Sequence, residues 1–163
     1  GIQFLFDHYK ENRGAILTDD MGLGKTIQTI ALLYAVQHKT GRYKDDKMPD
    51  TVRRVMKKQI TRRPVLITTP ASICAQFKAE IETWGYFEVY HVNGTTHTVQ
   101  QVEQLIGHNA LDIVLCSHDN LASNVEFYNT INWDMIVVDE LHKIKTLTSA
   151  RRKAFDQLLC VRR

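Results

Sequence analysis

The sequence predicts one α/β domain with a mostly parallel sheet and helices on both faces. Short apolar runs bounded by turn residues alternate along the chain with longer stretches of helical period. The 163 residues, 44% hydrophobic and 24% charged, have the size and composition of a single globular domain. The sequence has no apolar run of about 18 residues, and residues 1–12 lack the basic-then-apolar order of a signal peptide. We therefore expect a soluble, intracellular protein with no membrane partner.

The first third of the chain predicts helix, strand, loop and helix. Apolar residues at helical spacing indicate a helix over residues 2–9, which stops before Gly14. Residues 15–17, Ala-Ile-Leu, are expected to form a buried strand. A loop containing glycine follows, and then a helix over 26–38 that is apolar nearly all round, ended by Gly41.

Later segments repeat the order strand then helix. The expected strands cover residues 65–67, 89–92, 113–115 and 135–138, and the expected helices cover 73–84, 99–106 and 147–161. Trp84 and Trp133 lie beside apolar residues at an element end, so we expect both to anchor the core. The three separate cysteines predict reduced core thiols, and the histidines follow no metal-binding pattern.

Basic residues gather in two segments. Residues 39–63 hold ten Lys/Arg and three Asp, and residues 143–163 hold seven Lys/Arg and one Asp. We interpret residues 40–63 as a basic insertion that loops out of the domain, with a short helix near 52–58. Contact with DNA, a nuclear-import signal and simple solvation remain three open explanations for this insertion.

The segment Met21–Thr26 (Met-Gly-Leu-Gly-Lys-Thr) lies between a predicted strand and a predicted helix, where a phosphate-binding loop operates. Its glycines let backbone N–H groups turn inward, and the helix that follows adds its positive end. Lys25 would contact the β- and γ-phosphates, and the Thr26 hydroxyl would ligate Mg²⁺. The strict Walker pattern needs glycine at the position of Asp19, so a plain loop and helix cap is the alternative.

Two acids follow the apolar strand that ends at Val138. Carboxylates seldom end a core strand unless a cation lies there. Asp139 would hold Mg²⁺, and Glu140 would orient and deprotonate an attacking water. The two motifs together predict nucleotide binding.

The same residues resemble motifs of the SNF2 family of helicase-like ATPases. Residues 18–28, with an acidic pair before Met-Gly-Leu-Gly-Lys-Thr, resemble motif I, and residues 139–145, Asp-Glu-Leu-His-Lys-Ile-Lys, resemble motif II. Residues 69–72 with 76–80 resemble motif Ia, and 117–121 resemble a variant of motif Ib. The insertion and residues 82–87 are most similar to the Cockayne syndrome B-related excision-repair branch, especially its "6-like 2" type.

The resemblance implies a RecA-like domain that forms the N-terminal ATP-binding lobe of a nuclear, DNA-dependent ATPase, a translocase on duplex DNA acting in repair or chromatin remodelling. Its implied cofactors are ATP and Mg²⁺, and its implied partners are duplex DNA or chromatin and a C-terminal RecA-like lobe of the same protein. The implied ATP contacts are Asp20, Met21, Gly22, Leu23, Gly24, Lys25, Thr26 and His142, with Thr26 and Asp139 on the metal and Lys25 and Glu140 catalytic. The implied DNA contacts are Thr69, Ser72, Ser117 and Lys145, which would bind phosphates without reading sequence.

Three residues depart from the family pattern. Leu141 replaces a small residue, Thr146 stands where Asn is common, and His118 stands where Tyr is common. Leu141 and Thr146 make a nucleotide-binding scaffold that no longer cycles one alternative function. A DExH-type RNA helicase lobe is the other alternative, and the Asp-Asp-Met-Gly-Leu-Gly-Lys-Thr form of the loop argues against it. For residues 69–72, a strand exit with a helix cap is the structural alternative.

We expect residues 1–163 to be a fragment of a longer protein, without motif III and without the second lobe that carries the arginine fingers. Loss of an arginine finger can cost about 10³–10⁵ in rate. These residues alone should therefore bind Mg-ATP weakly and turn over little or none of it.

Overall fold

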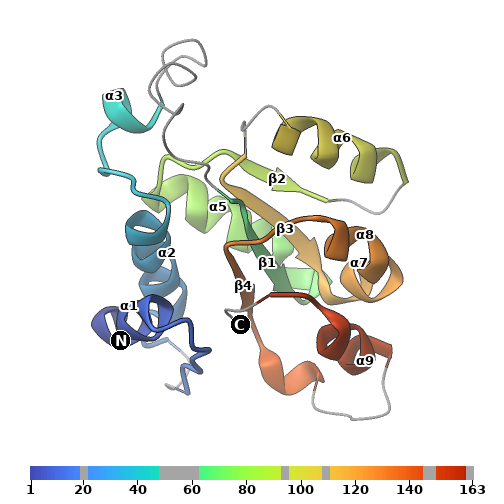
Figure 1. The fold of residues 1–163 in the computed structure, drawn as a ribbon. Helices are drawn as coiled ribbons and strands as arrows, with labels where there is room; N and C mark the ends of the chain where they lie inside the picture. Colours follow the sequence, from blue (N-terminus) through green and yellow to red (C-terminus); the bar gives the residue numbers. More distant parts are fainter. Residues whose placement is uncertain (19–21, 48–62, 93–95, 108–110, 145–149, 161–163) are drawn as a thin grey trace.

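Four parallel strands form the centre of the molecule (Figure 1). The computed structural model describes residues 1–18, 22–47, 63–92, 96–107, 111–144 and 150–160. The strands are β1 (Val65–Thr69), β2 (Val89–His91), β3 (Ile113–Ser117) and β4 (Met135–Val138). Their order in the sheet is β2-β3-β1-β4, and every described pairing is parallel, which confirms the predicted sheet.

Helices connect the strands. The α-helices are α1 (Ile2–Lys10), α2 (Lys25–Val36), α3 (Tyr43–Asp46), α5 (Cys74–Trp84), α6 (Thr96–Gly107), α7 (His118–Ser123), α8 (Val125–Thr130) and α9 (Ala150–Gln157), and the short 3₁₀ helices are η2 (Ala71–Ile73) and η3 (Leu141–Ile144). None of the helices in these described ranges is long and apolar enough to cross a membrane.

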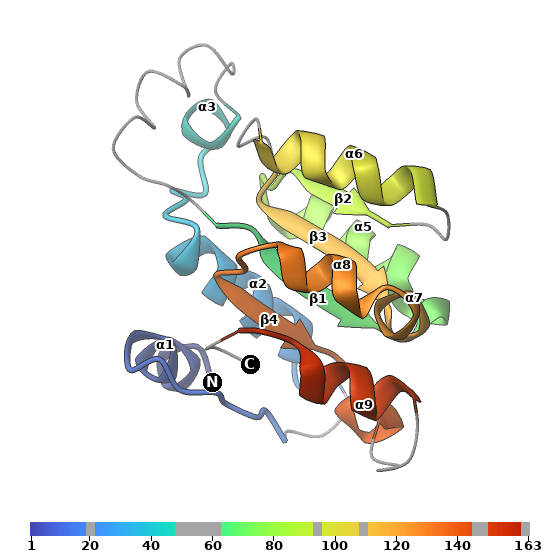
Figure 2. The same cartoon turned by 45° about the vertical axis from the view of Figure 1, so that its right-hand side comes forward.

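Both faces of the sheet are covered, as predicted. Helices α1, α2 and α5 pack on one face, and α6 to α9 pack on the other (Figures 1 and 2). Along β1 the side chains alternate between these two layers: Val65 and Ile67 join the first and Leu66 joins the second, as a pleated strand requires. The core is therefore two apolar layers separated by the sheet.

The expected strand over residues 15–17 is wrong. These residues belong to none of the four described strands, and the side chain of Ile16 is 64% exposed. A run of three apolar residues carries no measurable period, so it does not separate a buried strand from an exposed extended segment.

Hydrogen bonds hold the first residues of the basic insertion. Helix α2 ends at Val36, two residues before the predicted end, and the chain leaves the helix through His38, whose φ is +50°. The carboxylate of Asp46 then accepts hydrogen bonds from the N–H groups of Thr40 and Gly41, at 2.9 and 2.8 Å. The predicted helix near residues 52–58 lies outside the described residues.

Two expectations about single core residues have different outcomes. Trp133 is buried, and its indole N–H donates to the carbonyl of Tyr128. Trp84 is 54% exposed and bonds to Glu80 one helical turn earlier, so its expected core role is wrong.

The cysteines are free thiols, as expected, with Cys74 and Cys116 buried.

Candidate nucleotide-binding site

The glycine loop adopts the left-handed conformation that its glycines permit. Gly22 and Gly24 have φ angles of +86° and +73°, and Gly24 is the N-cap of α2. A β-carbon built on either glycine would meet nothing within 4 Å. The glycines are therefore required by backbone angle and not by crowding, and the space in front of them is open to a ligand.

Helix α2 supplies the polar side chains of this loop. Lys25 is its first residue and Thr26 its second, and both are partly buried. The first N–H groups of a helix have no intrahelical acceptors, so this end favours an anion. Leu23 is 61% exposed beside the loop. Asp19, Asp20 and Met21 lie outside the described residues.

The acidic pair is fixed by β4 and a sharp turn. The N–H of Asp139 donates to the carbonyl of Thr68 at 2.9 Å, which holds the end of β4 against β1. Glu140 then has a φ of +54°, an uncommon angle for a residue with a side chain, and the chain turns into η3. His142 Nδ1 lies 3.1 Å from the Glu140 carboxylate.

Lys25 and the acidic pair are close enough to interact electrostatically. Burial, and then the negative charge of Glu140, raise the pKa of Asp139, while the positive charges of Lys25 and Lys143 act in the opposite direction. Lys25 is 114 positions before Asp139 in the sequence, yet its ammonium is near enough to stabilise that carboxylate. This proximity joins the two sequence motifs in space.

The donor set fits a magnesium-bound triphosphate. Two adjacent carboxylates, one of them disfavoured as an anion by burial and by its neighbour, are relieved by a divalent cation. The described residues contain no group of three or more side chains suited to hold a metal alone. Mg²⁺ commonly takes only one or two carboxylates and completes its shell with phosphate and water.

Leu141, the residue that departs from motif II, begins η3 and is 44% exposed. Leu141 is therefore partly exposed and is not part of the buried core. Thr146 lies outside the described residues.

The residues expected to contact DNA have different surroundings. Ser72 is exposed in η2. Thr69 is fully buried, and its hydroxyl donates to the carbonyl of Pro70 at 3.1 Å. Ser117 caps α7 by accepting a hydrogen bond from the N–H of Asn120. Lys145 lies outside the described residues.

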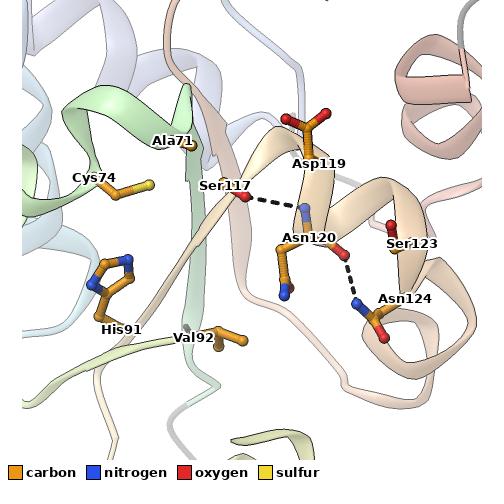
Figure 3. Close-up of a pocket in the computed structure, with 9 residues that line it drawn as sticks. All are labelled: Ala71, Cys74, His91, Val92, Ser117, Asp119, Asn120, Ser123 and Asn124. Atoms are coloured by element: carbon orange, nitrogen blue, oxygen red, sulfur yellow. Dashed lines mark hydrogen bonds between the residues drawn. The ribbon is translucent and has the colours of Figure 1, made fainter. Parts of the chain in front are cut away.

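A separate pocket of about 360 Å³ lies between the carboxyl ends of β1, β2 and β3 (Figure 3). Asp119, Asn120, Ser123 and Asn124 line one wall, and Cys74 and His91 line the other. Asp119 forms a two-bonded ion pair with Arg151 of α9, at 2.6 and 3.0 Å. Asp119, Asn120 and Ser123 of α7 thus form a polar surface beside Ser117, one of the expected DNA-contacting residues.

Sequence reasoning missed His118, which the motif Ib resemblance marked only as a departure. It is 2% exposed, and burial lowers its pKa to about 4, so the imidazole is neutral at pH 7. Its two ring nitrogens reach Thr68 and the backbone of Asp139. A polar residue directly after a buried strand was the available signal.

The parallel sheet, the helices on both faces and the glycine loop at the start of α2 define a RecA-like α/β domain. The model of the SNF2-related domain family matches residues 1–163, and the chain belongs to this family. The sequence resemblance to the SNF2 family is thereby confirmed.

Similar proteins extend this result. The chain is 40% identical over 150 residues to DNA excision repair protein ERCC-6-like 2 of Mus musculus, and 32% identical over 148 residues to Switch 2 of Arabidopsis thaliana. Each alignment covers 89% of the chain, but only 10% and 16% of the respective relative. The similarity to ERCC-6-like 2 agrees with the excision-repair branch indicated by the sequence.

One solved structure shares the fold over the whole chain. The Sulfolobus solfataricus SWI2/SNF2 ATPase core in complex with dsDNA has a TM-score of 0.74 and 23% sequence identity, and the match covers 29% of that chain. This agreement confirms the expected RecA-like fold.

Proposed function

We propose that the chain is the ATP-binding lobe of a DNA-dependent ATPase that translocates on duplex DNA in repair or chromatin remodelling. The observation that carries the proposal is that Lys25, which begins α2 directly after the left-handed Gly24, interacts electrostatically with Asp139 at the end of β4. Family membership over all 163 residues supports it, as does the name of the excision-repair relative.

Each residue of the proposed site has its own role in ATP hydrolysis. The glycine loop, with Asp20, Met21 and Leu23 beside Gly22 and Gly24, surrounds the phosphates with backbone N–H groups, and Lys25 neutralises their charge. Thr26 and Asp139 hold Mg²⁺, which supplies charge stabilisation on the transferred phosphoryl group when bound. Glu140 orients a water and accepts its proton. His142 keeps the Glu140 carboxylate in place from 3.1 Å away.

DNA would lie along the carboxyl edge of the sheet, where ligands of parallel sheets bind. We infer that Ser72, Ser117 and Lys145 contact phosphates. Thr69 contributes by fixing the turn through its bond to Pro70, since its hydroxyl is buried. Such contacts position a duplex without reading its sequence. The second RecA-like lobe of the same protein would close the site, and the nucleus is the compartment where such a protein meets chromatin.

The test measures ATP hydrolysis by the full-length protein with duplex DNA, with RNA and without nucleic acid. Lys25→Ala should lower the DNA-stimulated rate by at least about 10²–10³, because it removes a preorganised positive group. Glu140→Gln should lower it by about 10²–10⁴ while nucleotide binding persists. Lys78→Ala and Glu82→Gln are matched controls, because these residues pair with each other on the surface of α5.

The outcomes separate the alternatives. Stimulation by duplex DNA that is lost in Lys25→Ala and Glu140→Gln supports the proposal. Stimulation by RNA in place of DNA identifies an RNA helicase. Nucleotide binding without turnover in the unmodified protein identifies a scaffold that does not cycle.

A further inference from the structure

Three strand ends meet at the side chain of His118. This histidine follows β3 and begins α7, and its ring lies beneath the end of β1, with Nδ1 2.9 Å from the hydroxyl of Thr68. Its Nε2 lies 3.1 Å from the carbonyl oxygen of Asp139, which follows β4. The N–H of Asp139 in turn donates to the carbonyl of Thr68 at 2.9 Å. The three residues therefore form a closed ring of hydrogen bonds.

One neutral tautomer satisfies the whole ring. A backbone carbonyl only accepts, so the proton must be on Nε2, which donates to Asp139, and Nδ1 must then accept from the hydroxyl of Thr68. The imidazole is 2% exposed and packs edge-on against Phe155 of α9, with the ring centroids 5.8 Å apart. Both nitrogens are bonded and the two orientations of the ring are not equivalent, so His118 fixes where the Asp139 backbone lies.

The other side of α7 faces outward. Ser117 caps this helix, and Asp119 pairs with Arg151; Ser117, Asp119 and Asn120 all line the pocket at the carboxyl edge of the sheet (Figure 3). Asp119 directly follows His118 in α7, so the outer polar surface and the buried ring lie on adjacent residues of one helix. One helix start thus carries both Asp119, on the outer polar surface, and His118, which is bonded to the backbone of Asp139.

We propose that His118 is a positioning residue that couples the surface of α7 to the placement of Asp139 through the Nε2–carbonyl hydrogen bond. This inference rests on the proposed function, since it assigns a consequence for metal and nucleotide. A buried imidazole needs hydrogen-bond partners in any case, so what distinguishes His118 is which groups they are. Here the described bonds reach both the neighbouring strand and the carbonyl of the residue that would hold Mg²⁺.

Two conservative variants separate the two ring nitrogens. The amide of glutamine reaches the position of Nε2 and can still donate to the Asp139 carbonyl. The amide of asparagine reaches only the position of Nδ1, and keeps the Thr68 contact. In the full-length protein, His118→Gln should retain coupling and His118→Asn should lose it. His8→Gln, at an exposed histidine bonded within α1, is the control.

Two quantities are measured on each variant: the ratio of ATP hydrolysis with and without duplex DNA, and the Mg²⁺ concentration at half-maximal binding of a fluorescent ATP analogue. His118→Asn should lower the ratio, and raise the Mg²⁺ midpoint, by about 10-fold or more, the usual cost of removing a group that orients a metal ligand. His118→Gln should stay within about 3-fold of the unmodified protein in both, since the orienting donor is retained.

Equal losses in His118→Gln and His118→Asn, or a normal ratio and Mg²⁺ midpoint in His118→Asn, overturn the inference. A thermal midpoint lowered alike in both variants, with no difference between them in the ratio or the Mg²⁺ midpoint, would mark the residue as structural only and would overturn the inference as well. Absence of DNA-stimulated hydrolysis in the unmodified protein defeats the proposed function itself, and the inference with it. The two failures are therefore distinguishable.

Discussion

Lys39 and Asp112 form an ion pair of 2.6 Å in which both side chains are almost fully buried, 2% and 3% exposed. The ammonium of Lys39 also donates to the carbonyl of Tyr86 at 2.7 Å, and lies 5.3 Å from the centre of the Phe87 ring. Asp112 accepts a second bond from the N–H of Glu88. This pair joins the chain just after α2 to the residue that precedes β3.

Lys39→Met should destabilise the domain by about 3–5 kcal/mol, because it leaves the Asp112 carboxylate buried without a counter-charge. Urea unfolding gives this free energy. The double change Lys39→Met with Asp112→Asn should recover most of the loss, since asparagine is neutral and still accepts from Glu88. A loss below about 1 kcal/mol in the single variant would show that the pair is hydrated and contributes little.

The ion pair of Arg151 and Asp119 should behave differently, because its side chains are 40% and 63% exposed. Water and salt screen such a pair, and its typical contribution is about 0–1 kcal/mol. Asp119→Asn should therefore change the free energy of unfolding by less than about 1 kcal/mol, and raised salt should reduce even that. A loss comparable to that of Lys39→Met would contradict this.

Strands β1, β3 and β4 were predictable because each contains a continuous apolar run next to turn residues, as burial on both faces demands. Strand β2, which is Val-Tyr-His and half-buried, gives a weaker signal. The Lys25 loop and the acidic pair could also be recognised from the sequence, since glycine, lysine and carboxylate at element ends have few purely structural explanations. That Lys25 and Asp139 interact electrostatically, however, depends on how α2 and β4 are placed in the tertiary fold, which no local pattern contains.

The failures have local causes. Helices α7 and α8, six residues each, are too short to show a helical period. Ile16 is apolar but exposed, and Trp84 continues the apolar stripe of α5 only to the last residue of the helix, where the core no longer covers it. His118 needed the fold itself, because its partners come from two other strands.

Acid should weaken the domain through His118. Burial lowers its pKa to about 4 from an ordinary value of 6.5. Folding therefore favours the neutral imidazole. The stability that this preference gives the folded state is complete above pH 6.5 and is lost as the pH falls toward 4. The loss should be about 2 kcal/mol between pH 7 and pH 5. Comparison with His118→Gln, which has no titrating ring, isolates the effect; equal slopes in both proteins would refute it.

Asp139→Asn should stabilise the ligand-free protein while weakening Mg²⁺-dependent nucleotide binding. Burial and Glu140 raise the pKa of Asp139, so the ionised carboxylate is disfavoured in the folded state, and stability falls as the pH rises through that pKa. Asparagine removes this cost, and each kcal/mol gained should raise the Tm by about 2–4 °C. Calorimetry at pH 7 measures the change in Tm, and nucleotide titration with Mg²⁺ measures the change in binding. A lower Tm in the variant would contradict the assignment.

Glu140 allows stability and turnover to be separated at one position. Its φ of +54° is strained for any residue with a β-carbon, and most for a β-branched one. Glu140→Gly should leave the free energy of unfolding unchanged or raise it by up to about 1 kcal/mol, since relief of strain exceeds the entropy lost by glycine, and Glu140→Val should lower it by about 1–3 kcal/mol. Turnover should be lost in both, because neither retains the carboxylate that accepts the proton. Chemical unfolding and DNA-stimulated hydrolysis measure the two effects independently. Equal stability of the glycine and valine variants would show that the turn after β4 relaxes, and that Glu140 is not held by its backbone.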